Sequence, residues 1–220
     1  MAESGAVLHE QFDDLAQQQS ACRLGMWAFL ATEVLFFGGL ILSYVVYRHA
    51  YPHEFHFASH HLAFKLGAVN TAVLLCSSLS MALAVRAAQT GSRTRLVLFL
   101  LITLALGGAF LAIKGFEWRT EWIEGFVPGS HFTFVSPMPQ IDARKVELFF
   151  CLYFAMTGLH GLHMLIGLGL MAFLVVNASR GKYSSSNFTA VELAGLYWHF
   201  VDIVWIFLFP LLYLIGNHAT

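Results

Sequence analysis

The sequence predicts an all-α integral membrane protein, a bundle of five transmembrane helices. Two observations predict this class. Hydrophobic residues make up 58% of the 220 residues and charged residues only 11%, whereas soluble domains carry roughly 25% charged residues. Apolar runs recur at lengths of about 20 residues, enough for a helix to cross a bilayer. The composition excludes a soluble enzyme, and the formal net charge of −1 gives no sign of a nucleic-acid partner.

The apolar runs define the expected elements in order. Residues 1–22 are expected to form a polar amino-terminal tail, and residues 23–216 a single membrane domain. The expected spans are residues 24–47, 64–88, 96–115, 147–177 and 193–216. These spans must be helices, because lipid satisfies no backbone amide and the alternating pattern of barrel strands is absent. A long loop is expected at 116–145, and Pro210 is expected to kink the last span.

The positive charges indicate an orientation. Arg86, Arg93 and Arg95 flank one short connector, and Arg180 and Lys182 lie in another. Short connectors rich in lysine and arginine stay on the cytoplasmic side of a membrane. We therefore expect the amino terminus in the cytoplasm and the carboxyl terminus outside.

Ionisable side chains inside the spans are the candidate functional residues, because such groups are costly in lipid. Glu33 lies inside the first span without a charged neighbour, so its carboxyl should be neutral or paired with a donor on another helix. It joins two helices or serves a proton path. His160 and His163 share one face of the fourth span and are its candidate partners, with His163 preferred. Further polar residues of the spans are Asn70, Glu117, Glu192, His199 and Asp202.

The histidines keep two other interpretations open. Both the fourth and fifth spans carry histidine, as a di-haem bundle would, although His160 and His163 lie too close together to be axial ligands of two stacked haems. The loop at 48–61 holds five histidines and Glu54, a composition that can bind a metal. An exposed loop without metal is the simpler interpretation. We expect no metal or haem in this chain, because no ligand set outside this loop has the spacing of a metal site.

Five blocks of sequence, one for each span, carry a family resemblance. They read TEVLFF at 32–37, VNTAVLL at 69–75, KGFEW at 114–118, TGLHGLH at 157–163 and YWHFVDIVWIFL at 197–208. Together they resemble subunit III of the haem–copper terminal oxidases, the cytochrome c and quinol oxidases. The five-span form is similar to that of many bacterial members, whereas seven-span members have two further amino-terminal helices.

The resemblance implies a non-catalytic subunit without a redox centre, in a bacterial inner-membrane complex that reduces dioxygen to water and translocates protons. It implies subunit I as the main contact, subunit II in the same complex, and haems and copper in those partners. A respiratory supercomplex is a further possible context. It also implies bound phospholipid, for which Arg180 and Lys182 are candidate headgroup ligands.

Three alternatives to this assignment remain open. A subunit associated with nitric oxide reductase would share the start of the fourth span. A di-haem cytochrome b-type anchor would use histidines on two spans. A proton-coupled transporter would use Glu33, although the spans carry few polar residues with which to line a solute path.

Overall fold

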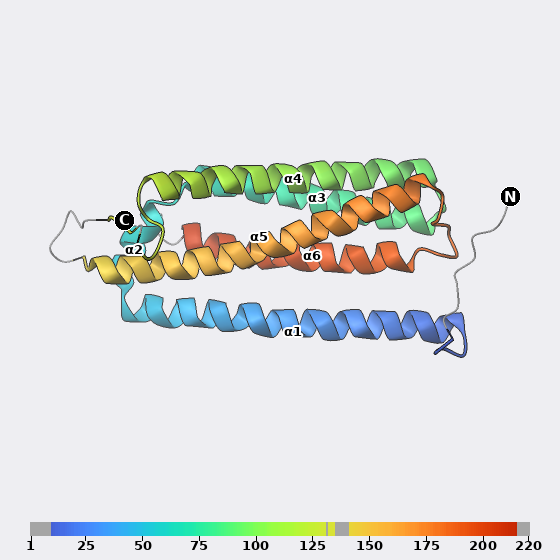
Figure 1. Cartoon of the computed structure of the whole chain (residues 1–220), viewed down its shortest axis with the longest axis horizontal. Coiled ribbons are helices and arrows are strands. Elements are labelled where there is room, and N and C mark those ends of the chain that lie inside the picture. Colours follow the sequence, from blue (N-terminus) through green and yellow to red (C-terminus); the bar gives the residue numbers. More distant parts are fainter. Residues whose placement is uncertain (1–9, 131, 135–140, 215–220) are drawn as a thin grey trace. The chain divides into compact units, whose positions relative to one another are not determined.

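A computed structural model describes residues 10–130, 132–134 and 141–214. Its helices are α1 (Leu15–Ala50), α2 (Pro52–His60), α3 (Phe64–Gln89), α4 (Arg93–Ile123), α5 (Ala143–Ser179), α6 (Thr189–Phe209) and a π-helical turn at Pro210–Leu214 (Figure 1). Five segments are long and apolar enough to cross a membrane: α1, α3, α4, α5 and the stretch Thr189–Leu214. The predicted all-α fold class with five candidate transmembrane helices is therefore confirmed.

The helices extend beyond the predicted spans. α1 begins at Leu15, inside the segment expected to be a polar tail. α4 continues to Ile123 and α5 begins at Ala143, and both of these ends fall inside the expected loop 116–145. Hydropathy marks only the apolar part of a helix, whereas backbone hydrogen bonding continues into its polar ends. Part of the expected loop, including residues 135–140, lies outside the described residues. The bilayer boundaries along each helix stay a prediction.

The histidine-rich segment after α1 is a helix, so its interpretation as an exposed loop is wrong. Pro52 occupies the first turn of α2, where a missing backbone N–H costs nothing. Phe55, Ala58 and Ser59 are buried, and their spacing places them on one face of the helix. Glu54 is also buried, and Lys145 Nζ donates to its Oε1 at 3.1 Å. Because the segment is rich in histidine, the spacing of its apolar residues did not stand out in the sequence.

The described residues divide into two compact units, each built from parts of the long helices. The first unit contains the residues up to Val34, together with Leu74–Gly108 and His163–Asp202. The second unit contains Leu35–Val73, the described part of Ala109–Leu162, and the residues from Ile203 onward.

Trp198 of α6 lies at the centre of the first unit. Its side chain is fully buried, and its Nε1 donates to Ser77 Oγ of α3 at 2.8 Å. A Cβ added at Gly107 of α4 would come within 2.7 Å of the indole ring, and one at Gly167 of α5 within 2.8 Å. Small residues here let the helices approach closely around one large ring, as in other membrane bundles.

Aromatic side chains fill the second unit. The ring of Trp205 lies 4.9 Å from that of Phe110, and its Nε1 donates to Thr71 Oγ1 at 3.0 Å. The hydroxyl of Tyr44 donates to the carbonyl of Leu211 at 3.0 Å. At Pro210, where a kink was expected, the α-helix gives way to π-helical bonding, because proline supplies no N–H to the α-helical ladder.

Candidate functional site

Glu33 of α1 and His163 of α5 form a pair in the first unit. His163 Nε2 lies 3.3 Å from Glu33 Oε2, and the two side chains are 11% and 19% exposed, respectively. Tyr197 of α6 donates its hydroxyl to the carbonyl of His163 at 3.0 Å, and its ring stacks with those of Phe29 and His163. An acid and an imidazole in contact can share one proton, and an apolar setting strengthens such a bond.

His160, the other sequence candidate, belongs to an aromatic cluster of the second unit. The residue is 1% exposed. Its ring centroid lies 5.4 Å from that of Phe110 and 5.1 Å from that of Trp205. The structure therefore brings Glu33 together with His163 and surrounds His160 with aromatic rings.

Lys114 is the centre of a second buried network, in which Glu117 takes part. Lys114 Nζ donates to Glu117 Oε2 at 3.0 Å, to the Tyr153 hydroxyl at 3.0 Å, and to the Tyr213 hydroxyl. Both tyrosine hydroxyls also donate to Glu117 Oε1. The network joins α4, α5 and the π-helical turn. Because the buried charges are paired and bonded to further groups, their desolvation is largely offset.

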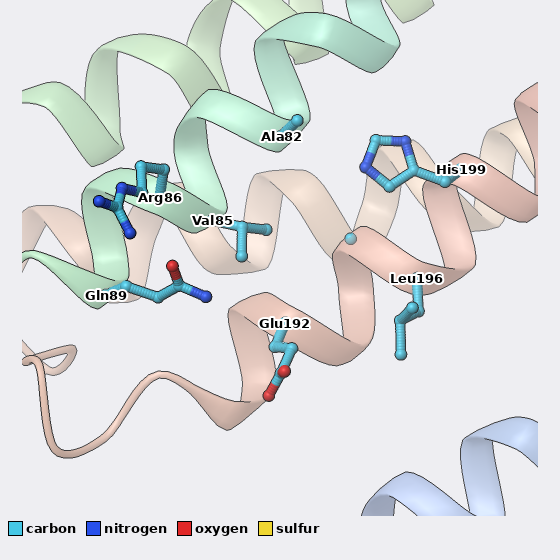
Figure 2. Close-up of a pocket in the computed structure, with 8 residues that line it drawn as sticks. Ala82, Val85, Arg86, Gln89, Glu192, Leu196 and His199 are labelled. Carbon is cyan, nitrogen blue, oxygen red and sulfur yellow. The ribbon is translucent and has the colours of Figure 1, made fainter.

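A groove with a volume of about 360 Å³ lies between α3 and α6 in the first unit. Figure 2 shows the side chains that line it: Ala82, Val85, Arg86 and Gln89 from α3, and Glu192, Leu196 and His199 from α6. Arg23 of α1 donates to Oε2 of the lining residue Glu192 at 2.9 Å. The lining residue His199 has its Nδ1 2.8 Å from Ser78 Oγ. The groove thus contains both a paired carboxylate and a hydrogen-bonded imidazole.

Two other polar candidates of the spans are buried. Asp202 is 3% exposed, and neither of its carboxylate oxygens makes a hydrogen bond within the described residues. In the second unit, Asn70 Nδ2 donates to the Phe110 carbonyl at 3.3 Å, which ties α3 to α4.

The histidines of α2 stand on one short helix. The rings of His56 and His60 stack with centroids 5.0 Å apart. Burial, together with the charges of His60, Arg48 and His53, lowers the pKa of His56 below its ordinary value. Across the described part of the chain, no group of three or more His, Cys, Asp or Glu side chains is placed to hold a metal ion.

A model of the family described as cytochrome c oxidase subunit III matches residues 11–217 of the chain. The chain belongs to the cytochrome c oxidase subunit III family. It is accordingly a subunit III of a haem–copper oxidase, part of a terminal oxidase complex and associated there with other oxidase subunits. With five helices able to span a bilayer, this subunit III is a multi-pass membrane protein.

Relatives of this subunit III carry two kinds of name. The chain is 32% identical to the probable cytochrome c oxidase subunit 3 of Nocardia farcinica, over 87% of each chain. It is also 32% identical to the cytochrome bo(3) ubiquinol oxidase subunit 3 of Pseudomonas aeruginosa, over 87% of this chain and 84% of the relative. The quinol oxidase subunit 3 of Bacillus subtilis is 28% identical, over 88% and 86%. Similarity of this degree covers both cytochrome c and quinol oxidases.

The candidate lipid ligands of this subunit III lie on its surface. Arg180 and Lys182 are both exposed, in the connector that follows α5. At the same end of α5, Arg93 of α4 donates to the carbonyl of Ser179. A cation at the carboxyl end of a helix complements the helix dipole, so this end of the subunit combines exposed positive charge with a capped helix.

Sequence reasoning missed several members of the buried networks. Lys114 lies at the end of the expected span 96–115, beside the expected loop. Tyr153, Tyr213 and Ser78 are not among the candidate residues that the sequence indicated. The spacing of Lys114 and Glu117 by three residues was an available signal, because such a pair shares one helix face. The tyrosines carried no comparable signal, since their role depends on helices distant in sequence.

Proposed function

We propose that this subunit III is an accessory, non-catalytic subunit that stabilises subunit I during turnover. The match to the family over residues 11–217 is the observation that carries this proposal. The chemistry of the buried groups supports it: Glu33 of α1 pairs with His163 of α5, and the Lys114–Glu117 pair of α4 bonds to the hydroxyls of Tyr153 and Tyr213. Ionisable groups that satisfy one another in this way hold helices in register. A supporting subunit needs rigidly packed helices in order to stabilise the subunit that it contacts.

In this proposal the redox chemistry takes place in the partner subunits. Subunit I is the main contact, subunit II belongs to the same complex, and haems and copper reside in those partners. The complex lies in a bacterial inner membrane, with the amino terminus of this chain in the cytoplasm, and passes electrons from the respiratory chain to dioxygen while translocating protons. Membership of a respiratory supercomplex is compatible with this arrangement.

The test compares the purified oxidase with and without this chain. We expect the initial rate of oxygen consumption to be similar in both preparations. The preparation without the chain should lose activity after fewer turnovers. The separated chain should show no haem absorption and no copper by metal analysis. Equal lifetimes would contradict the supporting role, and stoichiometric haem in the separated chain would favour a di-haem anchor.

We also propose that the subunit binds phospholipid, with Arg180 and Lys182 as headgroup ligands. Their exposure and positive charge support this role, since basic residues beside a membrane helix attract anionic headgroups. Native mass spectrometry of the complex should show fewer retained anionic lipids after the double substitution R180Q/K182Q. The matched control is R119Q, which removes an exposed arginine near the end of α4. Equal lipid retention in both variants would remove these two residues from the proposal.

A further inference from the structure

We propose that His56 and His60 of α2 form a binding site for a divalent metal ion of the kind that prefers imidazole, such as Zn²⁺. The two residues lie four positions apart at the carboxyl end of this short helix. The inference goes beyond the proposed supporting role and does not depend on it, because neither histidine takes part in the buried ion pairs that join the long helices.

The helix brings the two imidazoles together. Residues four positions apart on an α-helix are neighbours on the same face. The ring centroids of His56 and His60 are 5.0 Å apart, and their planes differ by 26°. A tetrahedral ion, about 2.1 Å from one nitrogen of each ring, holds two imidazole centroids roughly 5 Å apart. The two rings therefore already have the separation that a shared ion requires.

The opposite face of α2 is packed against the protein, which leaves the histidines on the outer face. Glu54 and Phe55 are buried, and Lys145 of α5 donates to Glu54 Oε1 at 3.1 Å. His60 is exposed and His56 is half-buried. An ion can therefore reach both rings from outside the helix without unfolding it.

The end of the helix also favours a cation. The last carbonyls of a helix carry partial negative charge, which attracts a positive ion. Among the residues that the structure describes, no third His, Cys, Asp or Glu side chain is placed to complete the site. Water then fills the remaining positions, as it does in zinc sites with open coordination. An ion held by two side chains exchanges readily, so a chain purified without added zinc should not retain it.

The bound ion should stabilise the last turn of α2. Each neutral imidazole donates a nitrogen lone pair and displaces a water molecule from the ion, and no electron is transferred. An ion that binds only the folded helix reduces the population of unfolded helix by a factor that grows with its concentration. At a free Zn²⁺ concentration of about ten times Kd, hydrogen exchange of the α2 amides should therefore slow by about tenfold.

Hydrogen exchange of the purified oxidase, measured by mass spectrometry, tests the site. The complex is washed with a chelator and then titrated with Zn²⁺, which should slow exchange of the α2 amides until chelator is added again. H60Q should abolish this response. H60C should preserve it, because a cysteine thiolate also binds zinc. The matched control H53Q removes another exposed histidine of α2 and should leave the response unchanged.

Three results would overturn the proposal. One is exchange of the α2 amides that does not respond to zinc. Another is an equal response in wild type and H60Q, which would place the ion elsewhere. The third is equal loss of the response in H53Q and H60Q. Exchange measured without zinc shows whether α2 is folded in each variant, and H60C keeps the test decisive if H60Q disturbs the helix. The turnover lifetime of the oxidase tests the supporting role separately.

Discussion

A charged side chain buried between helices needs a partner, because lipid and apolar side chains solvate charge poorly. Glu33 has His163, and Lys114 has Glu117 with two tyrosine hydroxyls. Each arrangement joins helices that are far apart in sequence. Single ionisable residues of this kind therefore help to determine which helices pack together.

Substitutions at Glu33 should distinguish the contribution of its hydrogen bond to stability from the contribution of its charge. E33Q keeps a group that can bond to His163 and should assemble almost normally. E33A leaves the imidazole of His163 without this partner and should cost about 1–3 kcal/mol, the usual price of an unmade buried hydrogen bond. Thermal inactivation of the oxidase measures the difference, with E124A at an exposed position as control. Identical inactivation of E33A and E33Q would show that the pair contributes nothing.

The Lys114 network should show strong coupling between its members. K114M leaves the Glu117 carboxylate buried without its cation, so it should destabilise the subunit by about 3–5 kcal/mol. The double variant K114M/E117Q removes both charges and should be less destabilised than the sum of the single changes. A double-mutant cycle by thermal unfolding measures this coupling. Additive effects of the two substitutions would contradict a coupled pair.

At the scale of the elements, hydropathy located the helices but not their ends. α1, α4 and α5 all continue past the apolar segment that identified them. The polar ends carry no hydropathy signal, although they bond as regular helix. α2 shows the same effect more strongly, because its buried face holds only Phe55, Ala58, Ser59 and Glu54 among histidines that are exposed or half-buried.

The stability of α2 should depend on pH through His56. Folded α2 lowers the pKa of His56, so the unfolded helix binds more protons near the ordinary value of about 6.5. Stability should be complete above that value and should fall as the pH drops below it. Hydrogen exchange of the α2 amides between pH 7.5 and pH 5 (roughly spanning that value) measures this effect. H56Q should flatten the dependence and H49Q should not, whereas an unchanged slope in H56Q would assign the effect to other groups.

At the scale of the whole molecule, the sequence predicted the fold class and the family, and it selected the pair that the structure brings together. Glu33 stood out because it is a lone acid in an apolar run, and few imidazoles were available as partners. Lys114 escaped notice because the expected span ended beside it. The hydrogen bonds of Tyr153, Tyr213 and Ser78 join helices that are distant in sequence. Local sequence does not encode such contacts, so these residues could not be selected from it.

The attachment of this subunit to its complex should depend on packing rather than on ion pairs. Large apolar side chains such as Leu35, Phe116 and Phe207 are exposed on the chain. In membranes, close van der Waals contact is a main source of helix association. Concentrated salt should therefore leave the subunit bound, whereas a harsh detergent should strip it. Gel filtration after each treatment measures retention, and release by salt alone would point to an electrostatic interface.

The most direct test of the central assignment is affinity purification of the tagged chain in a mild detergent. The account predicts co-purification with a larger haem-bearing membrane subunit and with oxygen-consuming activity. Addition of cytochrome c or of a quinol then identifies the electron donor. Recovery of a nitric oxide-reducing complex, or of the chain alone with its own haem absorption, would contradict the assignment to a terminal oxidase.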